Sequence, residues 1–215
     1  MKKLLILGAG GFGQMIKETV QLMGYSEVVF LDDTAKGKDV IGRCCDYKIS
    51  REQYPAAVAA FGHNKTRMLW TDKLLEAGYE VPAIVHPSAV VSPSAVLEPG
   101  CFVMQRAVVN TNTRIERAAL INSGAVVDHN TVIEAGAHVG LGSVVKAHCR
   151  IEAGRKVEAG EVIFSTRRKI EGADNRNLED AIYAFGFGQD CSYVKPFGEG
   201  HINETYAVYM PAQNG

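Results

Sequence analysis

The sequence has no long apolar run, no excess of charge of either sign and no cysteine spacing typical of a metal site. Its net charge of -1 over 215 residues gives no electrostatic preference for nucleic acid or for an anionic membrane. The first apolar run, Leu4 to Leu7, is too short for a signal peptide or a membrane span. Five cysteines, two of them adjacent at Cys44 and Cys45, fit a reducing cytoplasm better than a disulfide framework. We therefore expect a cytoplasmic protein that holds no metal.

What is present is a repeat of six residues that runs without a break over residues 86–163. Every hexad ends in Val, Leu or Ile, and the fourth position is small until Arg155 and Glu161. The thirteen hexads are HPSAVV, SPSAVL, EPGCFV, MQRAVV, NTNTRI, ERAALI, NSGAVV, DHNTVI, EAGAHV, GLGSVV, KAHCRI, EAGRKV and EAGEVI.

Such a repeat predicts a parallel β-helix, because each hexad can bury its apolar side only against its neighbours. In the left-handed form about three hexads make one triangular coil, with the aliphatic residue filling the prism and the small fourth residue closing the corner. An ordinary sheet would instead need a hydrophobic period of two with turn signals between the strands. We expect an α/β plus all-β protein whose β-helix occupies residues 86–163.

Residues 1–85 follow a different pattern. A short apolar run precedes a glycine turn and a helical pattern, and a second apolar run then ends in an acidic pair. This is the βαβ order of a nucleotide-binding unit, in which glycines let the backbone approach phosphates and the helix N-terminus attracts their charge. The unit is too small for a two-halved dinucleotide fold, so a nucleotide sugar is a better ligand than NAD. A tight turn that binds nothing is the alternative. The glycines are Gly8, Gly10, Gly11 and Gly13, and the acids are Asp32 and Asp33.

Five stretches together resemble the sugar acetyltransferases of the sialic-acid and bacillosamine type, the NeuD/PglD type. They are LILGAGGFGQ, FLDD, FGHN with Arg67, HPSAVVSPSAVLEPG and INSGAVVDHNTVIEAGAHVGLGS. The resemblance implies a small Rossmann-like domain that holds the nucleotide sugar, a left-handed β-helix and a homotrimer. It also implies acetyl-CoA in the cleft between neighbouring β-helices, with transfer of the acetyl group to a sugar amine or hydroxyl.

The same resemblance implies roles for individual residues. His129 corresponds to the general base, flanked by Asp128 and Asn130, while Asn122 and His138 correspond to the family's asparagine and second histidine. A coil takes about 18 residues, so the two histidines should lie half a circuit apart and should not meet within one chain. A backbone N–H at Gly142 is a candidate for stabilising the oxyanion and, with His138, for holding acetyl-CoA. The remaining substrate-binding candidates outside the glycine turn are Gly62, Asn64 and Arg67.

Two departures from the family pattern affect these expectations. Many members follow the base with an acid, whereas Asn130 follows it here, and an amide cannot stabilise imidazolium by charge. Phe12 stands in the glycine turn where relatives often place a histidine, so a polar contact with the sugar is lost there. We expect the first departure to affect the rate and the second to affect the choice of substrate.

Residues 164–215 depart from the hexad pattern. The basic run Arg167, Arg168 and Lys169 is interpreted as a solvated linker, although a CoA phosphate could use it. The stretch VKPFGEGHINETYAVYM resembles the opening strand, glycine loop and second strand of aminoglycoside-phosphotransferase-like kinases. A kinase also needs catalytic and metal-binding residues further downstream, so we expect no kinase activity in this segment. A simple β-hairpin is the alternative.

Two functions from different classes remain. The first is an acetyl-CoA-dependent acetyltransferase acting on a nucleotide-linked sugar, favoured by Asn122, His129 and His138. The second is a non-catalytic trimeric scaffold or sugar-nucleotide-binding module fused to a kinase, favoured by Asn130 and the short β-helix. The sequence does not separate N- from O-acetylation.

Overall fold

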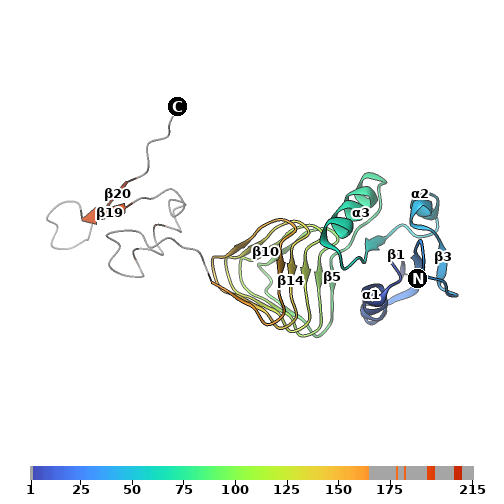
Figure 1. The fold of residues 1–215 in the computed structure, drawn as a ribbon, viewed down its shortest axis with the longest axis horizontal. Coiled ribbons are helices and arrows are strands. Elements are labelled where there is room, and N and C mark those ends of the chain that lie inside the picture. The colour runs from blue at the N-terminus through green and yellow to red at the C-terminus, as the bar shows by residue number, and fades with distance from the viewer. Residues whose placement is uncertain (1, 165–177, 179–181, 183–192, 197–205, 210–215) are drawn as a thin grey trace, which may run out of the picture. The chain divides into compact units, whose positions relative to one another are not determined.

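The computed structural model describes residues 2–164, 178, 182, 193–196 and 206–209 (Figure 1). The chain divides into two compact units, Met1–Ser165 and Thr166–Gly215. The first unit contains both the N-terminal α/β domain and the β-helix, which pack against each other. No helix among the described residues is long and apolar enough to cross a membrane.

The N-terminal domain is a four-stranded parallel sheet in the order β3-β2-β1-β4. Leu4 to Leu7 of β1 are fully buried between the two layers that the helices form. The predicted strand, turn, helix and strand are therefore present. The elements are β1 (Lys2–Leu7), α1 (Gly11–Leu22), β2 (Tyr25–Leu31), β3 (Val40–Gly42), a short 3-10 turn (Cys44–Asp46), α2 (Tyr47–Ser50), β4 (Ala57–Ala59) and α3 (Asn64–Glu76).

Fourteen two-residue strands then stack into three parallel sheets, which confirms the left-handed β-helix of hexapeptide repeats. Strands 18 residues apart are paired, as in Val127 with Val145. β5 already pairs with β8, so the β-helix begins at Ile84, two residues before the expected boundary. The strands are β5 (Ile84–Val85), β6 (Val90–Val91), β7 (Val96–Leu97), β8 (Phe102–Val103), β9 (Val108–Val109), β10 (Arg114–Ile115), β11 (Leu120–Ile121), β12 (Val126–Val127), β13 (Val132–Ile133), β14 (His138–Val139), β15 (Val144–Val145), β16 (Arg150–Ile151), β17 (Lys156–Val157) and β18 (Val162–Ile163).

The interior of the prism is built as the hexads predict. The sixth position supplies fully buried aliphatic residues such as Val127 and Val139, and the fourth supplies small ones such as Ala125. Where the fourth residue is polar, its hydroxyl bonds a corner carbonyl: Thr131 Oγ1 donates to Lys146 O at 3.1 Å and Ser143 Oγ to Gly140 O at 2.8 Å. Small size and a satisfied hydroxyl together allow the corners to close.

The third hexad position has a backbone conformation that the sequence did not reveal. From Gly100 to Gly160, every sixth residue has a positive φ. Glycine adopts this left-handed conformation without strain and asparagine tolerates it. One corner column consists of Gly100, Ala118, Gly136 and Gly154; the others contain Arg106, Gly124, Gly142 and Gly160, and Asn112, Asn130 and His148.

The three outer faces of the prism differ in chemistry. The N-terminal domain covers the sheet of β5, β8 and β11, where Phe12 packs edge-on against Phe102 with ring centroids 5.3 Å apart. The sheet of β7, β10, β13 and β16 carries the ion pairs Arg114–Glu98 and Arg150–Glu134. The third sheet bears a ladder of valines in register, which we call the valine ladder: Val90, Val108, Val126, Val144 and Val162.

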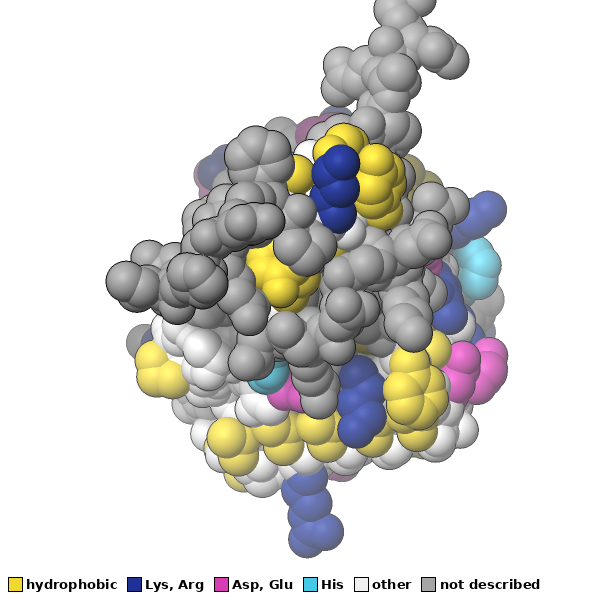
Figure 2. Space-filling model, turned by 90° about the vertical axis from the view of Figure 1, so that its left-hand side faces the viewer, with side chains coloured by type: hydrophobic (Ala, Val, Ile, Leu, Met, Phe, Trp, Pro, Cys, Tyr) yellow, Lys and Arg dark blue, Asp and Glu magenta, His cyan; other side chains and the backbone are white. Residues whose placement is uncertain are grey.

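Apolar side chains also reach the surface at the ends of the valine ladder, where Val90 and Val162 are exposed. Phe164, which follows the last coil, is 68% exposed. In the view of Figure 2, hydrophobic side chains form a row along one side of the molecule, interrupted by a cationic side chain. The valine ladder is an apolar strip on one sheet of the β-helix, and such a strip is suited to association.

The second unit contains the antiparallel pair β19 (Tyr193–Pro196) and β20 (Tyr206–Tyr209). Tyr193 and Tyr209 stack with ring centroids 4.3 Å apart. This pairing agrees both with a simple hairpin and with the opening strands of a kinase-like domain, so the kinase resemblance stays a prediction. Gly198, Gly200 and the basic run at 167–169 lie outside the described residues.

Candidate functional site: a glycine turn and two corners of the β-helix

The glycine turn joins β1 to α1 at the carboxyl edge of the sheet. Gly8 has a φ of +98°, and a Cβ at Gly13 would lie 2.0 Å from Gly8 O, so these two glycines make the turn possible. A Cβ at Gly10 or Gly11 would meet nothing within 4 Å, which leaves their backbone open. α1 begins at Gly11, and its N-terminal N–H groups suit a phosphate.

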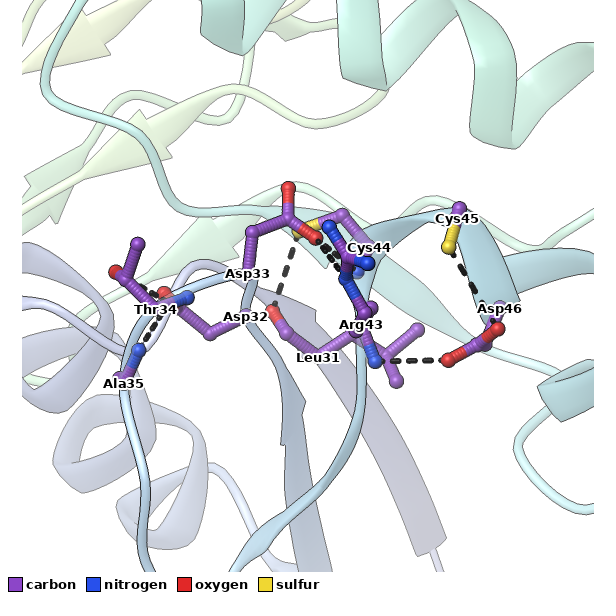
Figure 3. Close-up of polar contacts among 9 residues, drawn as sticks. All are labelled: Leu31, Asp32, Asp33, Thr34, Ala35, Arg43, Cys44, Cys45 and Asp46. Carbon is purple, nitrogen blue, oxygen red and sulfur yellow. Dashed lines mark hydrogen bonds and ion pairs between the residues drawn. The ribbon is translucent and has the colours of Figure 1, made fainter.

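Asp32 holds this turn from the end of β2. Its Oδ2 accepts the Ala9 N–H at 2.8 Å. Its Oδ1 accepts the N–H groups of Thr34 and Ala35 at 2.8 and 2.7 Å (Figure 3). These backbone hydrogen bonds, with Ala35 contributing most, lower the pKa of Asp32 to about 2. Both carboxylate oxygens of Asp32 therefore accept hydrogen bonds from the protein's own backbone.

Asp33 is the more available of the two acids. Its side chain is 51% exposed, and Oδ1 accepts the Cys44 N–H at 3.2 Å and lies 3.5 Å from Arg43 Nε (Figure 3). Because Asp32 is occupied, Asp33 is the better candidate for contact with a nucleoside.

Arg67 occupies a place that the sequence did not predict. It is completely buried, and all five of its N–H groups have acceptors. Nη1 donates to the carbonyls of Phe61 and Gly62, while Nε and Nη2 reach Ala118, Gly136 and Asn64. A guanidinium so occupied has no donor left for a substrate, and we revise its expected role from ligand contact to structure.

The predicted base lies at the corner between β12 and β13. His129 Nδ1 lies 3.0 Å from the amide nitrogen of Asn130. Asp128 Oδ1 accepts the backbone N–H of His129 at 2.8 Å and the side-chain amide of Asn110 at 3.1 Å. Asp128 therefore holds the corner backbone, and its pKa is lowered chiefly by the bond from His129 N–H. The ring itself faces Asn130.

His148, one coil further along, lies beside His129 rather than apart from it. The two imidazoles meet edge-on with centroids 5.1 Å apart. The backbone N–H of His148 donates to the backbone carbonyl of His129 at 3.1 Å. The 18-residue register, which aligns residues 130 and 148, is the signal that could have found this contact.

The structure brings Asn122 and His138 together, a pairing that the sequence analysis did not predict. Asn122 Nδ2 lies 3.1 Å from His138 Nε2, and Asn122 Oδ1 accepts the Ser123 N–H at 2.9 Å, which fixes the amide's orientation. Nε2 is therefore the acceptor, and the ring proton is on Nδ1. Burial, then the charges of Arg67 and Lys156, lower the pKa of His138 to about 4. The ring is neutral at neutral pH.

Gly142 lies at the corner between β14 and β15, with a φ of +61°. Its N–H donates to Ser123 O at 3.0 Å, so this N–H is not free to donate to an oxyanion as expected. A Cβ there would meet nothing within 4 Å, which leaves the corner open to a ligand that passes alongside.

The two candidate corners flank the valine ladder. The His129 corner follows β12, and the Gly142 corner precedes β15, which is the parallel neighbour of β12 in the same sheet. They therefore lie at opposite ends of the strands of that sheet. Among the residues that the structure describes, no group of three or more His, Cys, Asp or Glu side chains could hold a metal ion.

Comparison with known proteins finds relatives of the N-terminal domain and of the chain through the β-helix. A family model described as the PglD N-terminal domain matches residues 3–74. The acetyltransferase domain of PglB from Neisseria gonorrhoeae is 30% identical, with a TM-score of 0.61, over 77% of this chain and 92% of that one. The same domain in complex with acetyl coenzyme A is 31% identical, with a TM-score of 0.60, over 76% and 91%.

PerB from Caulobacter crescentus, solved in complex with CoA and GDP-perosamine, is also similar. It is 30% identical, with a TM-score of 0.66, over 77% of this chain and 90% of that one. At 30% identity over most of both chains, these matches show that the chain belongs to the NeuD/PglD-type family of sugar acetyltransferases and is an acyltransferase.

Proposed function

We propose that this protein transfers the acetyl group of acetyl-CoA to an amine of a nucleotide-linked sugar. The observation that carries the proposal is the His129 corner, where an imidazole with an adjacent amide stands at the edge of an apolar sheet face. Relatives solved with acetyl coenzyme A and with CoA and GDP-perosamine support the two substrates. A sugar hydroxyl is the alternative acceptor.

In this mechanism the acceptor amine attacks the thioester carbonyl carbon while His129 Nε2 takes its proton. That role requires the ring proton on Nδ1, and hence an acceptor beside Nδ1. A half-turn of the Asn130 amide places its oxygen 3.0 Å from Nδ1, where the amide nitrogen now lies. The tetrahedral intermediate then expels the CoA thiolate, and the imidazolium returns the proton to sulfur.

His138 is our proposed hydrogen-bond donor to the thioester oxygen. Because Asn122 occupies Nε2, the Nδ1–H of this neutral ring is the available donor. A neutral donor next to a developing oxyanion stabilises the transition state more than the ground state. Gly142 contributes an open corner beside CoA rather than an N–H.

The nucleotide part of the substrate is assigned to the N-terminal domain. The diphosphate would lie against the open backbone of Gly10 and Gly11 at the start of α1. Asp33 would contact the nucleoside, with Asp32 keeping the turn in shape.

We also propose a homotrimer that works in the cytoplasm. The valine ladder supplies an apolar surface on each chain, and a cyclic arrangement would bring the His129 corner of one chain to the Gly142 corner of the next. The free cysteines Cys44, Cys45, Cys101 and Cys149 suit a reducing compartment.

The test is a steady-state assay of thiol release from acetyl-CoA with a panel of UDP- and GDP-linked sugars, each carrying either an amine or only hydroxyls. The proposal expects turnover with an amino sugar and an acetamide in the product by mass spectrometry. Ester formation would select the hydroxyl alternative. Thiol release no faster than the enzyme-free background with every acceptor would favour the non-catalytic scaffold instead.

A further inference from the structure

Helix α3 lies along one corner column of the β-helix and forms a contact with each of its coils. Asn64 Nδ2 donates to Gly154 O at 3.0 Å, and Arg67 Nη2 and Nε donate to Gly136 O and Ala118 O at 3.0 and 2.8 Å. At Gly100, an added Cβ would lie 2.9 Å from Thr71 Cγ2. A helical turn advances about 5.4 Å and strands lie about 4.8 Å apart, so successive turns of α3 meet successive coils.

Arg67 lies at the centre of this contact and also donates to a loop of the N-terminal domain. Its Nη1 donates to Phe61 O at 3.0 Å and Gly62 O at 3.3 Å. That loop follows β4 and borders the glycine turn, since a Cβ on Gly8 would lie 3.2 Å from the Phe61 ring. On the β-helix side, Nη2 reaches Gly136 O and, at 3.5 Å, Ala137 O, and the next residue is His138.

We propose that Arg67 is a positioning residue that sets the distance between the nucleotide half-site and the acyl-transfer half-site. A single planar guanidinium joins the loop beside the glycine turn to the backbone just before His138. Its fork of five donors fixes both sides at once, which a lysine ammonium cannot do. The inference rests on the proposed function, because it concerns a sugar that is held by its nucleotide and acetylated at the β-helix.

A buried cation whose partners are backbone carbonyls and the Asn64 amide is costly, and it persists only where the surrounding structure over-determines it. Burial lowers the pKa of Arg67 to about 10, which still leaves it charged at neutral pH. The ion pair between Arg117 and Asp72, 2.7 Å long and half-exposed, already joins α3 to the β-helix. Arg67 adds orientation at the loop after β4, which that pair does not touch.

The experiment compares Arg67→Lys with wild type on two acceptors: the nucleotide-linked amino sugar and the same sugar without its nucleotide. Misplacing a tethered acceptor by about 1 Å can cost about 100-fold in rate. We expect kcat for the linked sugar to fall roughly 10- to 100-fold, with kcat/KM for the free sugar changed less than about 2-fold. Calorimetric affinities for the nucleoside diphosphate and for CoA should stay the same, because each half-site remains intact.

Arg117→Gln is the matched control, because it removes a contact from the same helix without affecting the loop at residues 61–62. It should leave both rates unchanged. Asn64→Ala, which loses one Arg67 acceptor and the Gly154 bond, repeats the test should Arg67→Lys fail to fold. Equal losses on both acceptors, or a lost affinity at either half-site, would overturn this inference alone. A wild-type enzyme inactive on every acceptor would overturn the proposed function as well.

Discussion

The amide nitrogen of Asn130 lies 3.0 Å from Nδ1 of His129, so an amide stands where a carboxylate would hold an imidazolium. Asn130 has a φ of +53°, and asparagine and aspartate tolerate this left-handed conformation better than other side chains. The corner's backbone conformation therefore suits asparagine and aspartate equally beside the base. An exchange to aspartate keeps the backbone and changes only the charge.

The first prediction concerns the base and its neighbour. His129→Ala should lower kcat by roughly 10²- to 10⁴-fold with little change in CoA affinity, because a general base contributes mainly in the transition state. Asn130→Asp should raise kcat, since a carboxylate fixes Nδ1–H and stabilises the imidazolium by charge. Steady-state kinetics with thiol detection measure both. The control is Asn112→Asp, one coil earlier in the same column, which should leave kcat unchanged. Full activity in His129→Ala would remove this residue from the mechanism.

The glycine turn allows a prediction that separates folding from binding. Gly13→Ala places a Cβ 2.0 Å from Gly8 O, so we expect a loss of about 3 kcal/mol or more in the free energy of unfolding. Gly11→Ala meets nothing within 4 Å and should unfold like wild type, with a weaker affinity for the nucleoside diphosphate. Urea unfolding and calorimetry distinguish the two effects. A destabilised Gly11→Ala would argue that the turn is not open as described.

Asp32 and Asp33 form a second matched pair. Asp32→Asn puts an amide N–H against backbone donors and should cost about 1–3 kcal/mol of stability. Because the pKa of Asp32 is lowered in the folded protein, its carboxylate stabilises the fold fully above pH 3.8, and this stabilisation is lost as the pH falls toward 2. Asp33→Asn should keep the stability and weaken nucleotide binding only. Equal thermal shifts in both variants would contradict this division of roles.

His138 predicts a pH dependence of stability. Its pKa falls from 6.5 to about 4 on folding, so the unfolded chain takes up a proton over a range where the folded one does not. The contribution of the neutral ring to the free energy of unfolding is therefore complete above pH 6.5 and is lost as the pH falls to 4. We expect the Tm difference between wild type and His138→Gln to shrink over that range. A difference independent of pH would mean that this partly buried ring titrates normally.

The β-helix could be predicted because its signal is local and repeated. The sixth residue of each hexad faces inward, as Val127 and Val145 do, so each hexad repeats the same apolar signal. The left-handed third position was missed because five of its residues are not glycine, among them Ala118 and Asn130. The coil geometry imposes that conformation on residues which by themselves would avoid it.

Arg67 shows why the site was harder to predict than the fold. The family resemblance made Arg67 a candidate for contact with the substrate. In the structure its guanidinium is buried against the carbonyls of Ala118 and Gly136, which are 51 and 69 residues away in sequence. A local sequence pattern cannot predict contacts over such separations. The pairing of Asn122 with His138 and the occupied N–H of Gly142 both depend on how successive coils stack.

The last prediction tests association through the valine ladder. Wild type should sediment at about three times the 23.3 kDa chain mass. Val126→Glu places a charge in the middle of the ladder, between Val108 and Val144, where burial against a neighbour would be unfavourable. It should dissociate the trimer and abolish transfer, because the His129 corner loses the neighbouring chain's Gly142 corner. Val132→Glu is the control, since this position lies in register between Arg114 and Arg150 on the charged face and should remain trimeric and active. A monomeric wild type that still transfers acetyl groups would show that one chain carries a complete site.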